Sequence, residues 1–138
     1  MIGGEAMKRL GEIFLEAGLQ DNPALTEVEQ QRLLKMPLRA PMIVVAITVA
    51  KDDPKVPVVE QILSTGAAVQ NFIVAIHAQG FASMWRTGWV TEHAHIRTAL
   101  GLLTNESIAG FIYLGTAANA PRQPTLLTVN DFVQQWSA

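Results

Sequence analysis

The sequence predicts a compact α+β domain in which a central sheet carries helices on its faces. Three observations support this fold class. Segments with helical periodicity outnumber those with strand character, the strand-like segments are few and separated, and 138 residues suit one domain covering residues 1–138. The chain is 49% apolar and only 16% charged. A lone copy would therefore expose apolar surface, and we expect an oligomer with an apolar interface.

The first third of the chain predicts two helices. Residues 5–17 are amphipathic, and we expect this helix to end at Gly18. Thr26 and Glu29 have the spacing of a capping box, which begins a second helix that should end before Pro37. The apolar face of the first helix consists of Met7, Leu10, Ile13, Phe14 and Ala17.

The middle of the chain predicts a buried strand and a long helix. Residues 42–50 are rich in β-branched side chains and do not alternate, which favours a strand covered on both faces. The helix from about Pro57 to Gln79 is apolar nearly all round, so it must be buried on nearly all sides. In so small a domain a partner subunit is the expected cover. Polar residues interrupt the run, and we do not expect it to span a membrane.

The last part of the chain predicts two further strands, one helix and an apolar tail. The strands are expected at residues 81–86 and 107–114, and a helix capped by Thr91 should run to about Leu100. The tail, residues 125–138, contains six large apolar side chains. It must dock on another surface, and the partner subunit is again a candidate.

Composition and spacing exclude several kinds of site. The net charge is −2 without a basic run, so nucleic-acid binding is not expected. The chain has no cysteine, which excludes thiol chemistry and permits a cytoplasmic location. His93 and His95 are two residues apart and His77 has no ligand at helical spacing, so we expect solvated histidines and no metal site. No phosphate loop, dinucleotide fingerprint or nucleophile elbow is present, and no catalytic side chain is assigned.

Trp85, Arg86 and Thr87 form the one cluster that suggests a ligand. An aromatic surface, a fixed cation and a hydroxyl stand before Gly88, and together they suit a planar, phosphorylated molecule. The alternative is a buried strand with one tryptophan in the core. The spacing alone leaves both interpretations open.

Over nearly its whole length the sequence resembles the nitroreductase family of flavoproteins, in particular the small bacterial NAD(P)H nitroreductases. The most specific match is AQGF at 78–81 followed by WRTG at 85–88. The other matching segments are PLRAPMIVV at 37–45, Lys55-Val56-Pro57, Glu60-Gln61, STGAA at 64–68 and GFIYLG at 110–115.

The resemblance implies a nitroreductase-like α+β sandwich with a mainly antiparallel sheet, an intertwined homodimer and one FMN in each site at the dimer interface. It implies an enzyme that transfers hydride from NAD(P)H through FMN to a nitroaromatic, quinone or similar acceptor. FMN would contact Trp85, Arg86 and Thr87. The residues matching the family's NAD(P) segment are Ala75, Ile76, His77, Ala78, Gln79 and Gly80.

One departure from the family suggests an alternative. Family members carry an Arg-Arg-Ser-type segment that binds the FMN phosphate, and Met1 of this chain corresponds to a position beyond it. We therefore expect a chain truncated at its N-terminus relative to the family, in which Arg86 supplies less of the phosphate charge than the family does. The alternative function is a non-catalytic dimeric module of the same fold that has lost flavin binding.

Overall fold

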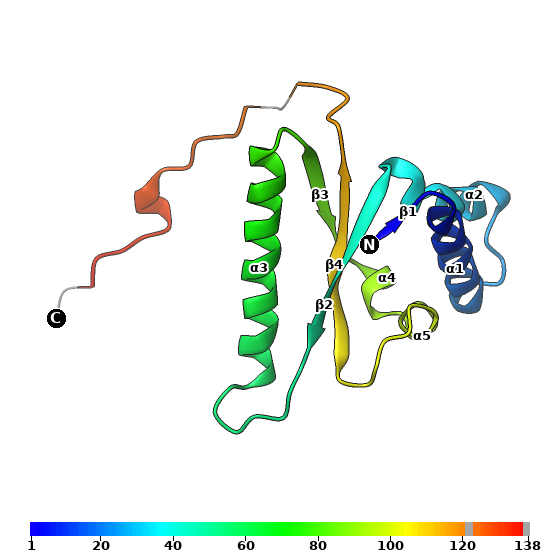
Figure 1. The fold of residues 1–138 in the computed structure, drawn as a ribbon, viewed down its shortest axis with the longest axis horizontal. Coiled ribbons are helices and arrows are strands. Elements are labelled where there is room, and N and C mark those ends of the chain that lie inside the picture. Colours follow the sequence, from blue (N-terminus) through cyan, green and yellow to red (C-terminus); the bar gives the residue numbers. More distant parts are fainter. Residues whose placement is uncertain (121–122, 137–138) are drawn as a thin grey trace.

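The structure, a computed structural model, describes residues 1–120 and 123–136. At its centre lies a four-stranded sheet with the order β1-β2-β4-β3, in which every neighbouring pair is antiparallel (Figure 1). The strands are β1 (Ile2–Gly3), β2 (Met42–Val49), β3 (Ala82–Arg86) and β4 (Glu106–Gly115). The expected α+β class and antiparallel sheet are confirmed, although no sequence pattern predicted β1.

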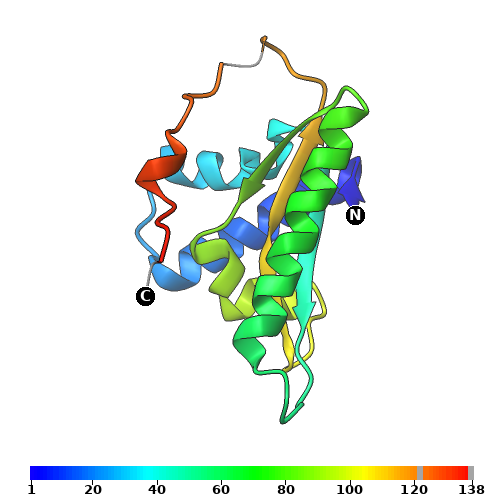
Figure 2. The same cartoon turned by 90° about the vertical axis from the view of Figure 1, so that its left-hand side faces the viewer.

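Helices cover both faces of this sheet. The long helix α3 lies along one face and the shorter helices lie on the other, which makes a three-layer sandwich (Figures 1 and 2). The helices are α1 (Glu5–Asp21), α2 (Glu27–Lys35), α3 (Val58–Ala78), α4 (Trp89–Glu92) and α5 (Ala94–Ala99), and the 3-10 turns are η1 (Pro37–Arg39) and η2 (Val129–Asp131).

The face of the sheet that carries α1 holds the main core. Phe14 is fully buried, and its ring meets that of Phe111 on β4 edge to face, with 5.5 Å between the ring centroids. All five residues expected on the apolar face of α1 are buried in this cluster. The amphipathic pattern therefore identified the face of α1 that packs on the sheet, and a single chain is enough to bury this side of the sheet.

The face that carries α3 holds a smaller core. Val69 packs there with Ile112 and Leu114 of β4, and it is the only residue of α3 that is buried. The opposite side of the helix is open, with Leu63 68% exposed and Val59 60% exposed. By length and composition α3 could cross a bilayer, and 6% of its most apolar window is buried. The sequence predicts that this helix is buried on nearly all sides, and a single chain does not bury it in that way.

An irregularity in β4 is filled by Trp85. The pairing of β2 with β4 shifts between Ala46 and Ile47, which leaves Ala109 as the extra residue of a bulge. The carbonyl oxygen of Ala109 accepts a hydrogen bond of 3.0 Å from Trp85 Nε1. A Cβ on Gly110 would overlap the indole. The absence of a side chain at Gly110 thus makes room for the tryptophan.

The first helix is longer than expected. α1 continues past Gly18 to Asp21. A Cβ on Gly18 would lie 2.5 Å from Leu33 Cδ1, so this glycine permits the close approach of α1 and α2. The glycine was interpreted as a helix stop, and that prediction was wrong because its role is in packing.

The helix expected from Thr91 to Leu100 is two short helices. His93 lies between them and accepts a hydrogen bond of 3.2 Å from the backbone N–H of His95. The side chains of His93 and His95 are only 13% and 28% exposed, and they contact Asp21 and Glu16 of α1. The prediction of solvated surface histidines was therefore wrong for these two.

The C-terminal tail lies away from the body of the chain (Figure 1). Leu126 and Trp136 are 92% and 88% exposed. Residues 137–138 of the expected docking segment lie outside the described residues. Within the described part of the tail, docking on its own chain is not observed.

Candidate functional site

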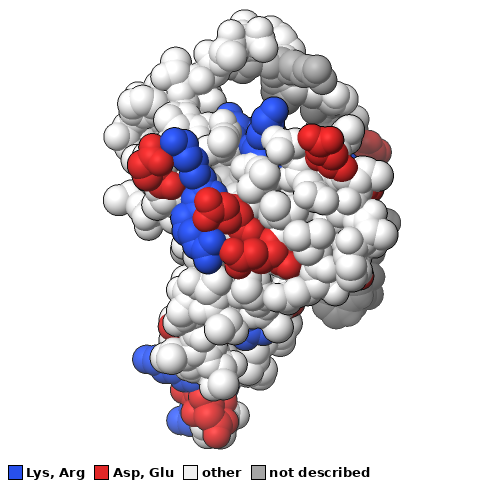
Figure 3. Space-filling model, turned by 90° about the vertical axis from the view of Figure 1, so that its right-hand side faces the viewer, with Lys and Arg blue, Asp and Glu red and all other residues white. Residues whose placement is uncertain are grey.

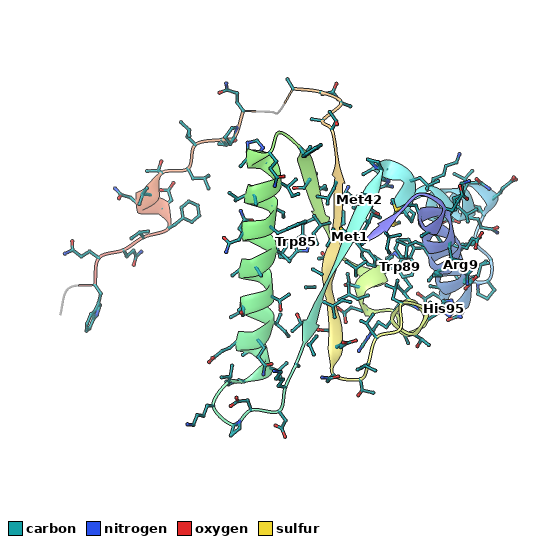
Figure 4. The ribbon with its side chains drawn as sticks, viewed as in Figure 1. Met1, Arg9, Met42, Trp85, Trp89 and His95 are labelled. Atoms are coloured by element: carbon teal, nitrogen blue, oxygen red, sulfur yellow. The ribbon has the colours of Figure 1, made fainter. Side chains whose placement is uncertain are left out.

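Trp85 and Arg86 lie on opposite faces of β3. Trp85 pairs with Ile112 and points toward α3, whereas Arg86 pairs with Phe111 on the α1 side (Figure 4). The indole is partly buried and hydrogen-bonded to Ala109, as in the interpretation that placed one tryptophan in the core. Arg86 and Thr87 are exposed. The guanidinium and the hydroxyl are therefore available to a ligand on one molecular surface.

The strand that carries these residues lies at the edge of the sheet. β3 pairs with β4, and within the described chain its other edge has no neighbouring strand. An edge strand presents backbone N–H and C=O groups in a row. Gly88 follows with a φ of 107°, a conformation that favours glycine. A planar ligand with polar edges can thus meet backbone donors and acceptors directly.

Two hollows adjoin Arg86. The first has a volume of about 290 Å³ and lies along β3, with Ser83 and Met84 in its wall. The second has a volume of about 270 Å³ and reaches Thr87 and Trp89. Arg39, Arg86 and Tyr113 line both hollows. Each volume is at or below the low end of the range for small-molecule sites, about 300–1,000 Å³.

Tyr113 is the buried polar group between the two hollows. Its hydroxyl donates a hydrogen bond of 3.1 Å to the carbonyl oxygen of Met36. Burial raises the pKa of the Tyr113 phenol, while the charges of Arg39 and Arg86 act in the opposite direction. The phenol therefore remains a neutral donor near two cations.

The segment matched to NAD(P) lies at the other end of β3. Residues 75–80 are the last turn of α3 and the glycine turn that precedes the strand, whereas Thr87 follows it. Ile76 packs toward the small core, and the other five residues are exposed. Five strand residues separate the two groups by roughly 15 Å. A single chain does not bring them together.

Arg39 and Tyr113 were not recognised as site residues from the sequence. Both lie within segments that matched the family, but neither received a role. Antiparallel pairing of the expected strands 81–86 and 107–114 places Tyr113 on the face of Arg86 only in the observed register, which pairs Met84 with Tyr113. No sequence signal pointed to Arg39, because its approach depends on the turn η1.

The residues of this site are suited to binding a ligand. It offers cations, hydroxyls and backbone groups, and the described residues contain no group of three or more His, Cys, Asp or Glu side chains that could hold a metal. Such an arrangement can hold and orient an anionic, planar molecule. A redox reaction there would require a bound cofactor to carry the electrons.

Comparison with known proteins gives the family. The sequence matches the Nitroreductase family over residues 1–116. It is 34% identical over 116 residues to "Putative NAD(P)H nitroreductase YdjA" of Escherichia coli, covering 84% of this chain and 62% of that protein. It is 35% identical over 115 residues to a "Putative NAD(P)H nitroreductase" of Haemophilus influenzae, covering 78% of this chain and 61% of that protein. The chain thus spans about three fifths of the length of these relatives.

Solved structures agree on the fold. A nitroreductase-like family protein from Bacillus cereus superposes with a TM-score of 0.80 at 20% identity, covering 99% of this chain and 71% of that one. A variant of the FMN and NADPH-dependent nitroreductase NfnB from Sphigopyxis sp. strain HMH superposes with a TM-score of 0.58 at 21% identity. The match covers 92% of this chain and 56% of that one. By sequence match and by fold, this chain belongs to the nitroreductase family.

Proposed function

We propose that this chain forms part of an FMN-dependent oxidoreductase that transfers hydride from NAD(P)H to a small acceptor such as a nitroaromatic or a quinone. The observation that carries the proposal is the exposed Arg86-Thr87 pair at the open edge of β3, beside two hollows, in a chain of the nitroreductase family. The pyridine nucleotide and FMN come from the names of its relatives.

The residues present fit an FMN molecule. Arg86 supplies a planar cation for a phosphate or a ring carbonyl, and Thr87 supplies a hydroxyl beside an open backbone edge. On the opposite face of β3, Trp85 fixes the strand by its hydrogen bond to Ala109 in the bulge of β4. FMN, when bound, supplies the two-electron chemistry, and the chain's residues bind and orient it. An NAD(P)H donor also implies the cytoplasmic location expected from the sequence.

The proposal includes a homodimer built on the open side of α3. Its exposed residues there are mostly apolar or small, with Gln70 and Asn71 among them. Protein interfaces combine an apolar centre with hydrogen bonds in this way. Leu63→Glu should abolish the dimer in analytical ultracentrifugation while the monomer keeps its circular dichroism. If the wild type is monomeric in buffer and binds to lipid vesicles, a membrane and not a second copy covers the apolar side of α3.

A dimer also provides places for the tail and for the NAD(P) segment. The exposed apolar residues of residues 125–136 require a surface that their own chain does not offer. Residues 75–80 are too far from Thr87 to share its site within one copy. We propose that both serve the second copy, so that each complete site contains residues of two chains.

Flavin binding and NAD(P)H oxidation test the function directly. Purified protein should show a flavin spectrum or accept added FMN, and then oxidise NADH or NADPH in the presence of a quinone. Arg86→Gln should weaken FMN binding by about tenfold or more, since a hydrogen bond from a charged group is lost. Arg9→Gln, on the far side of α1, should change nothing. A folded protein that refuses FMN at millimolar concentration would favour the non-catalytic module.

A further inference from the structure

His93 joins the two short helices that follow the candidate site. α4 ends at Glu92 and α5 begins at Ala94, and His93 lies between them. Its backbone N–H donates to the carbonyl oxygen of Trp89 at 3.0 Å, and its own carbonyl oxygen accepts from the N–H of Arg97 at 3.1 Å. The residue thus takes part in the backbone hydrogen bonding of both helices, and its side chain is largely buried.

The two ring nitrogens of His93 have different partners. Nδ1 accepts a hydrogen bond of 3.2 Å from the backbone N–H of His95, which makes the ring the N-cap of α5. Nε2 lies 3.3 Å from Oδ1 of Asp21 on α1. An N–H group can only donate, so Nδ1 must keep its lone pair, and the ring proton must lie on Nε2 beside the carboxylate. The contacts therefore select one neutral tautomer.

A second proton on the ring would break the cap. It can bind only at Nδ1, where it would face the N–H of His95, and two donors cannot share a hydrogen bond. The contact of Nε2 with Asp21 would remain and would gain the attraction of opposite charges. Protonation therefore keeps the ring on α1 while it removes the cap from α5. Histidine is the side chain whose charge ordinarily changes between pH 5 and pH 8.

The charged groups around His93 come from α1 and α5. Asp21 faces Nε2, and the ring of His95 lies with its centroid 6.5 Å away. His95 in turn contacts Glu16 at 2.8 Å, and Glu16 pairs with Arg9 on the outer side of α1, where Lys and Arg lie side by side with Asp and Glu (Figure 3). A proton on His95 would strengthen its contact with Glu16. This second pair therefore holds α5 on α1 more firmly at low pH, and the loss of the cap must come from His93.

Trp89 connects His93 with the candidate site. The two rings meet edge to face, with 5.8 Å between their centroids. The indole lies on the side of the sheet that carries α1 (Figure 4), and it is 41% exposed. It lines the 270 Å³ hollow that Arg86 and Thr87 also line, and it lines a further hollow of about 360 Å³ between α1 and α2. A shift of α4 therefore changes the wall of both hollows.

We infer that His93 is a pH-sensitive switch that positions Trp89 beside the candidate site. Its neutral ring caps α5 and supports the indole. Protonation removes the cap, and α4 and α5 are then held less firmly, because His93 belongs to the hydrogen bonding of both helices. The wall of the two hollows is therefore better ordered at pH 8 than at pH 5. The inference goes beyond the proposed function, since it depends only on contacts within this chain.

Hydrogen exchange of the full chain at pH 8 and pH 5 tests the switch, with each rate expressed relative to the intrinsic rate at that pH. In wild type the backbone amides of α4 and α5 should lose protection by about fivefold or more at pH 5, which is the effect of losing a cap. His93→Asn is the matched variant, because its side-chain oxygen can accept from the same N–H and its amide does not titrate. It should show equal protection at both pH values. His95→Gln keeps a donor for Glu16 and should respond as wild type does.

Acrylamide quenching of fluorescence tests whether the change reaches the indole. The difference between each protein and the same protein carrying Trp89→Phe gives the accessibility of this side chain, which should rise at pH 5 in wild type and stay constant in His93→Asn. The inference is overturned if α4 and α5 keep their protection in wild type, or if His93→Asn loses it equally. It is also overturned if the response disappears in His95→Gln, or if Trp89 is equally accessible at both pH values. FMN and NAD(P)H take no part in these measurements, so their outcome is independent of the proposed function.

Discussion

The two faces of the sheet differ in how completely one chain can cover them. On the α1 side the described chain buries a cluster of twelve residues, and polar and charged side chains lie on the outside of the helices. On the α3 side it buries three, and apolar side chains remain on the outside. The chain covers the first face by itself, whereas it leaves the outer side of α3 on the second face exposed.

The difference follows from the helices themselves. α1 has its apolar residues on one stripe, so packing that stripe on the sheet leaves a surface that water solvates well. α3 has apolar residues around most of its circumference, and the sheet can cover only one side. The larger buried core lies on the α1 side, and the exposed α3 side is the surface on which the proposed dimer would form.

A pair of truncations should produce the largest contrast between these faces. Phe14→Ala removes a fully buried ring from the α1 side and should lower the free energy of unfolding by about 3–5 kcal/mol. Leu63→Ala, on the open side of α3, should change it by less than about 0.5 kcal/mol in dilute monomer. Urea titrations followed by circular dichroism measure both changes.

Protein concentration sharpens the same comparison. If α3 forms an interface, the cost of Leu63→Ala should grow as the concentration rises, because association stabilises the folded state. The cost of Phe14→Ala should not depend on concentration in this way. Equal costs for the two variants in dilute solution would show that the α3 side is as important to the single chain as the α1 side.

Local patterns predicted most of this fold. The stripe of α1, the capping box at Thr26 and the β-branched run of β2 each determine structure through neighbours in the sequence, and each element is confirmed. The expected cover on both faces of β2 is not found in the single chain, where only Ile43 and Thr48 of the strand are buried. The errors occurred where distant contacts decide. Gly18 was interpreted as a helix end, whereas Leu33 of another helix explains it. His93 was assigned to solvent, whereas Asp21 of α1 lies beside it.

The sequence predicted only those residues of the candidate site that lie on or next to β3. Trp85, Arg86 and Thr87 are adjacent, so the sequence identified them as a group. Strand alternation predicts that Trp85 and Arg86 lie on opposite faces of the sheet, but only the structure shows that Trp85 faces α3 and Arg86 faces the hollows. Arg39 comes from a turn 47 residues earlier, and only the folded chain shows that it lines the same hollows.

Two glycine substitutions beside Trp85 test how tightly the α3 side is built. Gly110→Ala places a methyl group against the indole and the backbone of Arg86, and should destabilise the fold by about 1–3 kcal/mol. Gly66→Ala is the matched control, because its Cβ would lie 3.8 Å from Trp85 Cη2, an ordinary contact. It should stabilise α3 by up to about 1 kcal/mol through helix propensity. Thermal unfolding compares them, and a harmless Gly110→Ala would mean that the indole moves freely.

The smallest expected effect lies on the α1 side and depends on pH. Glu16 accepts a hydrogen bond of 2.8 Å from His95 and pairs with Arg9 at 2.8 Å, and these contacts lower the pKa of its carboxyl below the ordinary value of 4.5. A lowered pKa means that the folded state favours the ionised form, so the gain is present above pH 4.5 and is lost as the pH falls through the lowered value.

Glu16→Gln should therefore be less stable than wild type at pH 7, with a difference that shrinks as the pH falls below 4.5. The effect is small because the carboxylate is exposed to solvent and salt. Asp52→Asn removes the same charge from a loop where it makes no ion pair with described residues, and should show no such narrowing. Urea titrations at a series of pH values measure the difference in free energy of unfolding between Glu16→Gln and wild type. If this difference stays constant as the pH falls, the carboxylate acts by packing, and its charge does not help to hold α5 on α1.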